Sequence, residues 1–464
     1  MQAAEQLAEW SSGLELTDVP AEVADAAKLH LLDAVGTGLA GLAFGQVEAA
    51  RAVALEMGGE PEATGIGLPR KVGAGAAALA NGATMHALDF DDTHELTLIH
   101  SSVVVGATVL AVGEAVGASG AEVLAAAIAG YEISSRVGLA APGALHLRGF
   151  HPTSVCGVFA AAAAAAHLRG LSAEQTANAL GIAGSQASGL MEYLADGSQT
   201  KPLHAGWAAH AGITAAALAA HGATGPASVL EGRFGLLASH LGEFDAAALT
   251  AELGSRWETT LIAFKAYPVC HLSHSTLDAV RESGLGPDGV EEIVAEVAGD
   301  VAIGLVLEPA ARKLRPATPY EAKFSLPYSI AALLVRGELG LDSFTDEAIA
   351  DQRVLDLAAR VRYEVVDFGP GGGDLSGGVR ARAGGEEFTA RVLTPRGTPS
   401  NPLAEEDVRR KFIANASLAL PRVEAEELLS ILSGLEGHSA AGLGAALGGA
   451  PSSQPTRRST ASAR

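Results

Sequence analysis

Repeated helical patterning with small side chains is the strongest constraint on how this chain can fold. From Pro20 to about Leu261, apolar residues recur at helical spacing, and glycines or short polar turns separate the stretches. Aromatic residues make up only 5% of the chain, and small side chains let helices approach closely. We therefore predict a packed helical bundle rather than an aromatic-rich β-sandwich. After a first helix near Pro20, the predicted helices are Ala74–Leu88, Ser102–Val116, Ala121–Leu139, Ser154–Leu168, Ala173–Leu190 and Leu203–His221.

The pattern changes after about Leu261, where segments that mix apolar and charged residues replace the alanine-rich helices. Such segments are typical of half-buried strands. The predicted strands are Glu291–Ala298, Val361–Val366, Val379–Ala383 and Glu387–Leu393, the last two flanking Gly384–Gly385 as a β-hairpin. We expect one clear helix, about Tyr328–Arg336, between the first of these strands and the rest.

The chain is expected to return to the helical part near its C-terminus, because Asn401 and Pro402 form a capping pattern for a following helix. We predict a mainly α fold: a large all-α helical domain built from residues 1–262 and 400–448, with a smaller α+β lid domain inserted at residues 263–399. Residues 449–464 have almost no large apolar side chains, so we expect a disordered tail there.

Charge and cysteine content exclude several classes of protein. The net charge of −22 provides no basic footprint for nucleic acid, and an anionic substrate would need a locally positive pocket. The two cysteines are too few for a disulfide framework or for an aconitase-type iron–sulfur cluster held by this chain, and they fit a reducing cytoplasm.

No export or membrane segment is expected. The first ten residues carry acids and no basic stretch, unlike a signal peptide. The alanine-rich run Val155–Ala166 is too short to span a bilayer and is interpreted as a buried helix. We therefore expect a cytoplasmic protein.

An acidic cluster, Asp89, Asp91 and Asp92, precedes Thr93 and His100. Three carboxylates so close together repel one another unless a cation, a hydroxyl donor or a helix N-terminus compensates them. One interpretation is the rim of an active site in which His100 is a general acid or base, since histidine titrates near neutrality. The other is a solvated, acidic helix end.

Two further residues stand directly before helix-starting prolines. His151 precedes Pro152 in a turn that opens an alanine-rich helix, where it is either functional or a structural cap. Lys201 ends a glycine-containing loop before Pro202. A lysine beside the positive end of a helix does not neutralise the helix dipole, so it more plausibly binds an anion than serves as a solvated loop lysine.

The junction between the two predicted domains contains Lys265, His271 and His274. Histidines three positions apart could bind a metal, but no second pair with ligand spacing is evident and Lys265 would oppose a cation. We therefore predict no metal site. The alternative to a functional junction is a linker that only packs.

Taken together, these segments resemble the MmgE/PrpD family from about residue 5 to about residue 435. The similar segments, in family order, are HALDFDDTH with the later HSS, GYEISSRVG, GFHPTSVCG, DGSQTKPLHAGWAAHAG, KAYPVCHLSH, EAKFSLPYS and NPLAEEDVRRKF. The family includes 2-methylcitrate dehydratase, cis-aconitate decarboxylase and iminodisuccinate epimerase.

The resemblance implies a homodimer whose site lies between a helical domain and an inserted lid. It places the functional positions on a set of residues carried over motif by motif: His100, His151, Lys201 and His274 as catalytic, and Asp89, Thr93, Lys265 and His271 as substrate-binding. Of the two junction histidines, His274 is favoured over His271. Members work without a metal or an organic cofactor.

The function expected from this resemblance is a cofactor-independent lyase, a dehydratase or decarboxylase acting on a small citrate-like polycarboxylic acid. Lys201 and Lys265 would stabilise the developing negative charge, while His100 or His151 moves a proton next to a carboxylate. The alternatives are an epimerase of a dicarboxylic amino-acid derivative such as iminodisuccinate, and an inactive helical scaffold. A magnesium-dependent isoprenoid synthase is disfavoured, because the chain has no second acidic metal motif and few aromatic residues.

Overall fold

The computed structural model describes residues 1–44 and 47–448, so the tail predicted at residues 449–464 lies outside the described residues. Helices hold 58% of the residues and strands 9%, which confirms the mainly α fold class. Two large hydrophobic cores divide the described chain. We call the elements around the first core the helical body and those around the second core the smaller body.

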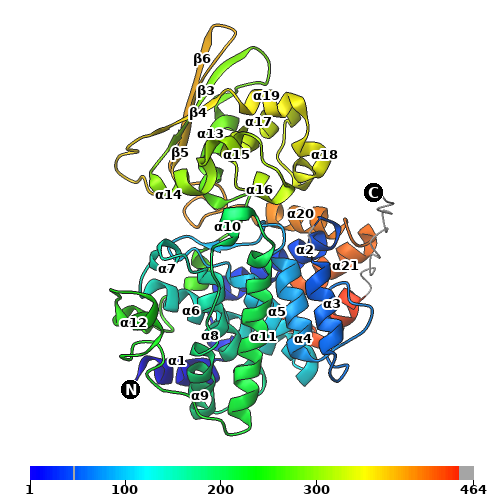
Figure 1. The fold of residues 1–464 in the computed structure, drawn as a ribbon. Coiled ribbons are helices and arrows are strands. Elements are labelled where there is room, and N and C mark those ends of the chain that lie inside the picture. The colour runs from blue at the N-terminus through cyan, green and yellow to red at the C-terminus, as the bar shows by residue number, and fades with distance from the viewer. Residues whose placement is uncertain (45–46, 449–464) are drawn as a thin grey trace, which may run out of the picture.

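The helical body draws its core from both ends of the chain. Its buried apolar residues run from Ala3 to Ile262 and resume from Val408 to Leu447. The N-terminal helix α2 packs against the C-terminal helix α20, as Figure 1 shows on the right of the molecule. The helices are α1 (Ala3–Ser12), α2 (Ala21–Phe44), α3 (Glu48–Met57), α4 (Ala74–Met85), α5 (Ser101–Val116), α6 (Gly120–Leu139), α7 (Ala144–Leu147), α8 (Pro152–Leu168), α9 (Ala173–Gly184), α10 (Tyr193–Asp196), α11 (Thr200–Ala220), α12 (Leu236–His240), α20 (Glu405–Ala416), α21 (Arg422–Ser433) and α22 (Ala440–Gly448).

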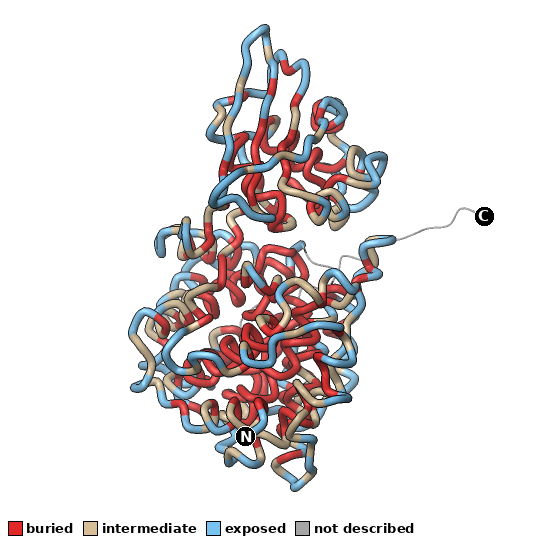
Figure 2. The backbone as a smooth tube through the Cα atoms, turned by 90° about the vertical axis from the view of Figure 1, so that its left-hand side faces the viewer, coloured by how far each residue is buried: buried red, intermediate tan, exposed pale blue. Residues whose placement is uncertain are grey.

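Helix α8 lies at the centre of this body and contacts α5, α6, α9 and α11. All of its residues from Pro152 to Ala166 are buried, in agreement with the buried interior in Figure 2. Residues 160 to 166 are all alanines, whose small side chains let the surrounding helices approach closely. Within the described residues, no helix is both long enough and apolar enough to cross a membrane.

Helices α4 and α11 meet at a pair of glycines. A Cβ atom on Gly206 would lie 2.2 Å from the carbonyl oxygen of Leu79, and one on Gly82 would lie 2.7 Å from the Cα of Gly206. Only hydrogen side chains fit at this crossing. The crossing places the first turn of α11, which contains Lys201, close to the end of α4, which Asp89 follows.

The smaller body contains a mixed four-stranded sheet in the order β4-β3-β5-β6. Its strands are β3 (Val290–Val297), β4 (Val361–Val365), β5 (Gly377–Ala383) and β6 (Glu386–Val392). β3 pairs parallel with β4 and antiparallel with β5, and β5 pairs antiparallel with β6. The predicted hairpin is confirmed, because Gly384 and Gly385 turn the chain at φ values of +59° and +83°.

More helices occur in the smaller body than the single one predicted between its strands. The predicted helix is present as α17, but short helices of three to seven residues surround it. Such short segments carry too few residues for a helical apolar period to be visible in the sequence. The helical elements are α13 (His274–Ser283), α14 (Asp300–Ala302), the π-helical turn η5 (Ile303–Leu307), α15 (Ala310–Leu314), α16 (Pro319–Ala322), α17 (Leu326–Arg336), α18 (Asp346–Ile349) and α19 (Gln352–Ala358).

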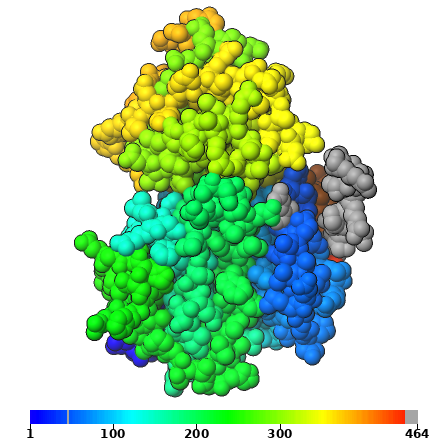
Figure 3. All heavy atoms as spheres, in the orientation of Figure 1, coloured from blue at the N-terminus to red at the C-terminus, as the bar shows by residue number. Residues whose placement is uncertain are grey.

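The two bodies meet along a broad boundary, visible in Figure 3 between the yellow upper part and the green and blue lower part. A third apolar cluster, in which Phe90 and Leu88 of the helical body join Leu341 of the smaller body, lies there. The short strands β1 (Thr93–His94) and β2 (Ile262–Ala263) pair where the chain leaves the helical body. The predicted domain limits at 262/263 and 399/400 stay predictions.

Three predicted helix ends are wrong. α9 ends at Gly184 instead of Leu190, because the following chain pairs with the segment before α8 through a bridge between Phe150 and Leu190. α4 ends at Met85, three residues early. Asn401 does not cap a helix: its side-chain amide donates to the carbonyl of Thr394, and α20 begins only at Glu405.

The glycine crossing predicts opposite effects of one methyl group at two helical positions. Gly206→Ala should lower the free energy of unfolding by about 1–3 kcal/mol, because the added Cβ overlaps the α4 backbone. Gly106→Ala on α5 is the matched control: its Cβ would be 3.6 Å from its nearest neighbour, so we expect a gain of about 0.5–1 kcal/mol from helix propensity. Denaturant unfolding curves of both variants beside wild type provide the measurement, and equal effects at the two positions would contradict the close crossing.

Candidate active site

A cavity at the boundary of the two bodies brings together most of the residues singled out in the sequence. It holds about 570 Å³ of space free of protein atoms, counted out to its mouth. Both bodies and the junction between them contribute to its walls. Its lining residues are Asp89, Thr93, Leu98, His100, His146, His151, Met191, Tyr193, Leu194, Lys201, Lys265, Cys270, His271, Leu272, Leu305, Phe324 and Leu375.

A buried ion cluster of one carboxylate and two ammonium groups forms one wall. Oδ1 of Asp89 lies 2.5 Å from Nζ of Lys201 and 3.1 Å from Nζ of Lys265. Lys265 also donates to the backbone carbonyl of Asp89 at 3.0 Å. Asp89 adopts a left-handed backbone conformation, with φ of +52°, which asparagine and aspartate tolerate better than most residues.

The charges of this cluster stabilise one another. Burial alone would raise the pKa of Asp89, but Lys201 and Lys265 outweigh burial and hold it well below its usual value. Burial would lower the pKa of Lys201, but Asp89 raises it well above its usual value. Asp89 and Lys201 are thus charged at neutral pH, and one carboxylate faces two ammonium groups in the cavity wall.

A second carboxylate, Asp91, orients two histidines. Its Oδ2 lies 2.9 Å from Nδ1 of His86 and 2.9 Å from Nδ1 of His100. Burial would raise the pKa of Asp91, but the two histidines hold it well below its usual value, so the carboxylate is ionised and accepts from both rings. In that arrangement the Nδ1 atoms carry the protons and the Nε2 atom of each ring is free to accept one. Burial lowers the pKa of His100 itself to about 4.

The third carboxylate and the remaining polar residue of the motif are also buried and paired. Asp92 lies 2.9 Å from Nδ1 of His30 and accepts a hydrogen bond from the Ser102 hydroxyl. The hydroxyl of Thr93 lies 3.3 Å from Nδ1 of His100. The interpretation of this cluster as a solvated acidic helix end is therefore wrong: each carboxylate has its own cation or hydroxyl donor.

His151 stands at the N-terminus of α8, as predicted, and lies within the same cavity. Its Nδ1 is 3.1 Å from Nδ1 of His204 on α11. The next residue but one, Thr153, accepts a hydrogen bond from the backbone N–H of His100 at 3.0 Å. Burial lowers the pKa of His151 well below its usual value, so this imidazole is neutral at neutral pH.

The junction histidines are not equivalent. His271 lines the cavity, whereas His274 lies behind it with its ring centroid 4.8 Å from that of His271. His274 is the first residue of α13 and its Nε2 is 3.4 Å from the carbonyl of Val269. The cavity lining thus contains His271 and not His274, and the preference for His274 as the residue that faces the substrate stays a prediction.

Lys201 lies in a helix, where the sequence predicts the end of a loop. It lies in the first turn of α11 rather than in a solvated loop, and it is only 4% exposed. Its ammonium group sits 5.2 Å from the ring centroid of Phe324 on the opposite body. The interpretation as a solvated loop lysine is therefore wrong.

Sequence reasoning missed several residues of this site. Tyr193 and His146 line the cavity without belonging to any motif with an obvious chemical role. His86 lies beside the cavity, five positions before Asp91, and a histidine so close to an acidic cluster was the available signal. Nitrogen atoms of His86, His100 and His151 lie within 4.8 Å of one another, so among the described residues this is the group that could hold a metal ion.

The arrangement can bind an anion next to neutral imidazoles. The ammonium groups of Lys201 and Lys265 supply the local positive potential that an anion needs in a chain of net charge −22. The unprotonated Nε2 atoms of the histidines can accept a proton and return it. Apolar residues such as Leu98, Met191 and Leu272 cover the rest of the wall and keep water out.

Comparisons with known proteins identify relatives over almost the whole chain. Residues 5–248 match the MmgE/PrpD N-terminal domain, and residues 267–436 match the MmgE/PrpD C-terminal domain. The human cis-aconitate decarboxylase is 34% identical over 379 residues, which cover 78% of this chain and 76% of that protein. The mouse cis-aconitate decarboxylase is 32% identical over 385 residues (78% and 75%), and that of Aspergillus terreus is 29% identical over 461 residues (93% and 92%).

The ion cluster predicts a coupling between Asp89 and Lys201 in stability. Lys201→Met should lower the free energy of unfolding at pH 7 by about 3 kcal/mol, because it leaves a buried carboxylate with one cation fewer. Asp89→Asn alone leaves two buried ammonium groups without a carboxylate, so adding Lys201→Met to it should recover about 1 kcal/mol or more of its loss, since one of these charges is then gone. Denaturant unfolding of both single variants and the double variant measures the coupling.

Arg410→Met serves as the control for this double-mutant cycle. Its ion pair with Asp407 is largely exposed, so we expect a change below about 1 kcal/mol. Strictly additive effects of the two substitutions would contradict the coupling.

The low pKa of Asp89 also makes stability depend on pH. The stabilisation that its carboxylate provides is present above the unfolded-state pKa and is lost only as pH falls through the folded-state value.

Proposed function

This chain belongs to the MmgE/PrpD family and is a lyase of that family, and from this premise we propose that it decarboxylates a citrate-like polycarboxylic acid such as cis-aconitate. The observation that carries the proposal is the cavity in which Lys201 and Lys265 outnumber Asp89 beside neutral histidines. The curated relatives compared above are named as cis-aconitate decarboxylases, which favours decarboxylation over dehydration and over the epimerase alternative.

Substrate binding follows from the charges of the cavity. Lys201 and Lys265 each can hold a carboxylate, and the apolar wall receives the carboxylate that leaves. A carboxylate transferred from water to an apolar wall is destabilised relative to neutral CO₂. The same wall therefore promotes cleavage while the lysines hold the rest of the molecule in place.

The electron pair of the cleaved bond determines what the residues must do. In cis-aconitate, loss of CO₂ from the CH₂–COO⁻ arm leaves a pair that forms a new double bond to the central carbon. The electron pair of the original double bond then moves onto the vinylic CH carbon, which carries one of the two remaining carboxylates. Negative charge builds on that carboxylate, where Lys201 or Lys265 stabilises it, until the carbon takes up one proton.

The proton comes from an imidazole that the substrate itself has charged. His100 and His151 have lowered pKa values, because they are buried and the lysines are near. A bound polycarboxylate brings negative charge next to these rings and raises their pKa values again. His100, held by Asp91 at Nδ1, then delivers a proton from Nε2 to the carbon.

Three further statements stand with this proposal. His271 takes the substrate-facing position at the junction. The enzyme works without a metal or organic cofactor, since Lys201 and Lys265 perform the charge stabilisation that a metal would provide. The smaller body acts as the lid of a homodimeric protein.

A panel of acids tests the function directly. Purified protein, before and after exhaustive chelation, is incubated in D₂O with cis-aconitate, 2-methylcitrate, citrate and iminodisuccinate and followed by NMR. We expect CO₂ release from cis-aconitate with one deuterium in the product, and equal rates before and after chelation. Water loss from 2-methylcitrate alone would shift the assignment to a dehydratase, and no reaction at all would indicate a scaffold. Activity that is lost on chelation and restored only by zinc or magnesium would point to a metal at His86, His100 and His151.

The pH dependence of kcat/KM distinguishes acid from base catalysis at His100. Its pKa of about 4 makes the free ring neutral above that pH. Because decarboxylation needs the protonated ring, kcat/KM corrected for substrate ionisation should fall as pH rises from about 5 to about 8. A base would instead give a plateau over this range and a loss below about pH 4.

Two variants complete the pH experiment. His100→Gln should lower kcat by about a hundredfold or more, as expected when a positioned acid is removed. It should also remove the fall of kcat/KM between about pH 5 and about pH 8. His438→Gln, at an exposed position, should leave the profile unchanged. A flat wild-type profile from about pH 5 to 8 would contradict the assignment of His100 as the acid.

A further inference from the structure

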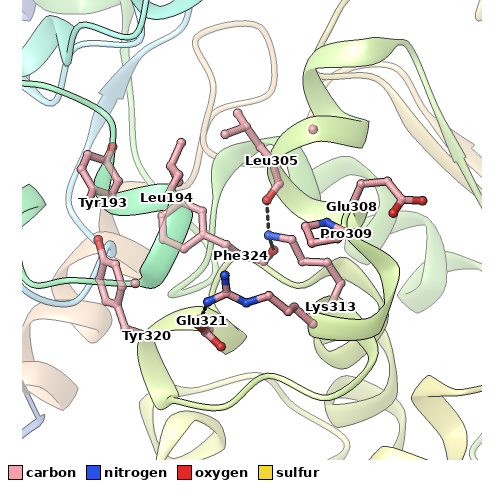
Figure 4. A pocket seen from close by; sticks show the side chains of 12 residues that line it. Tyr193, Leu194, Leu305, Glu308, Pro309, Lys313, Tyr320, Glu321 and Phe324 are labelled. Carbon is pink, nitrogen blue, oxygen red and sulfur yellow. Dashed lines mark hydrogen bonds and ion pairs between the residues drawn. The ribbon is translucent and has the colours of Figure 1, made fainter.

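A second cavity, shown in Figure 4, adjoins the candidate active site, and we call it the outer cavity because its lining side chains are more exposed. It is lined by α10 of the helical body and by η5, α15 and α16 of the smaller body. Four residues belong to the walls of both cavities: Tyr193, Leu194, Leu305 and Phe324. The two cavities are therefore separated by single side chains rather than by a backbone layer.

The partition between the cavities has one lysine on each side. On the inner side, Nζ of Lys201 lies 5.2 Å from the ring centroid of Phe324. On the outer side, Nζ of Lys313 donates to the carbonyl of Leu305 at 2.6 Å and to that of Phe324 at 2.8 Å, and Figure 4 marks these contacts. An ammonium group has three N–H donors, so Lys313 keeps one for a carboxylate in the outer cavity.

A second cation lies beside Lys313. The guanidinium of Arg312 is paired with Glu321 and donates to the carbonyl of Ala195 on α10 at 2.5 Å. It thereby joins the two bodies across the outer cavity while remaining largely exposed. Glu308 and Glu321 balance the charges of these two cations in the lining, and Lys313, which forms no ion pair among the described residues, is the cation that can receive an anion.

Two side chains of the partition between the cavities are only partly packed. Leu194 is 36% exposed and Leu305 is half-buried, so neither side chain is locked in a core. Leu305 lies in the π-helical turn η5, a short element whose irregular hydrogen bonding is often found at functional sites. Rotation of these two side chains would open part of the wall that the cavities share.

We propose that the outer cavity is the access route to the active site, where a polycarboxylate first binds at Lys313 and Arg312 before passing Leu305 to reach Lys201. The inference rests on the proposed function for the nature of the anion. It assigns a binding step and a gate to residues that take no part in the chemistry. Lys313 and Lys201, on opposite faces of the same partition, allow the anion to pass from one cation to the next.

Gly304 offers a clean way to obstruct this route. It lines the outer cavity, and a Cβ built on it would meet none of the described residues within 4 Å. Gly304→Phe therefore adds bulk at the rim without displacing the fold. Gly437→Phe is the matched control, because a Cβ there also meets none of the described residues within 4 Å and the position, in the helical body, is exposed and far along the chain from either cavity.

The readout is exchange of the inert tricarboxylate tricarballylate, measured by NMR line shape on wild type and both variants. Gly304→Phe should lower the association and dissociation rates together, by about tenfold, and leave Kd within about twofold of wild type, since the inner site is untouched. Gly437→Phe should match wild type in every rate. Unchanged rates in Gly304→Phe with a wild-type melt, or a raised Kd with unchanged association, would overturn the access route.

Charge provides the second arm. Arg312→Gln should slow association by about threefold to tenfold at low salt, and the difference should vanish at high salt, because steering is screened. Arg382→Gln, which removes the same charge from an exposed pair on β5, should have no such effect. Equal effects of the two substitutions would overturn the steering role.

The two proposals fail in different ways. Wild type that converts cis-aconitate while Gly304→Phe exchanges tricarballylate normally would overturn the access route alone. Wild type that converts none of the acids but exchanges tricarballylate, slowed in Gly304→Phe, would overturn the proposed reaction and leave the access route standing. Wild type that neither converts nor binds any of these acids would overturn both.

Discussion

The packing of the rest of the structure depends on the contact of the Asp89 carboxylate with two buried ammonium groups. Taking each of these ions out of water costs several kcal/mol, and only their mutual contact at 2.5 and 3.1 Å offsets that cost. The three residues come from the end of α4, the first turn of α11 and the junction after β2. The helices must therefore bring these segments together closely, and the glycine crossing of α4 and α11 is what permits it.

The same constraint links stability to chemistry. Asp89 can neutralise only one of its two ammonium partners, so the cavity keeps positive charge. This charge attracts anions that the net negative charge of the chain would otherwise repel. The neighbouring carboxylates are each assigned to other partners, Asp91 to two histidines and Asp92 to His30 and Ser102. A cluster that looks repulsive along the chain is thus three separate, compensated sites in space.

The sequence alone predicts the long elements well, because they carry many repeats of one pattern. The alanine-rich helices around α5, α6 and α8 begin within two residues of their predicted starts, and the Gly384–Gly385 hairpin is where its turn chemistry indicates. The ends of α4 and α9 and the role of Asn401 are wrong, because tertiary partners rather than local propensity determine them.

For the site, residue types and motif order indicate which side chains matter but not how they face. Nothing in the spacing of His271 and His274 reveals which one reaches the cavity, and the burial of Lys201 follows from a carboxylate 112 positions away. His86 is not predicted as a site residue, because its contact with Asp91 forms only in the folded chain.

The arrangement of the C-terminal helices has a consequence for the order in which the protein is made. Lys411, on α20, donates to the backbone carbonyls of Phe90 at 2.7 Å and Lys265 at 3.1 Å, next to two of the three members of the ion cluster. During synthesis, the smaller body, with a hydrophobic core of its own, emerges complete before α20 does. These backbone contacts beside the cavity can therefore form only when nearly the whole chain has left the ribosome.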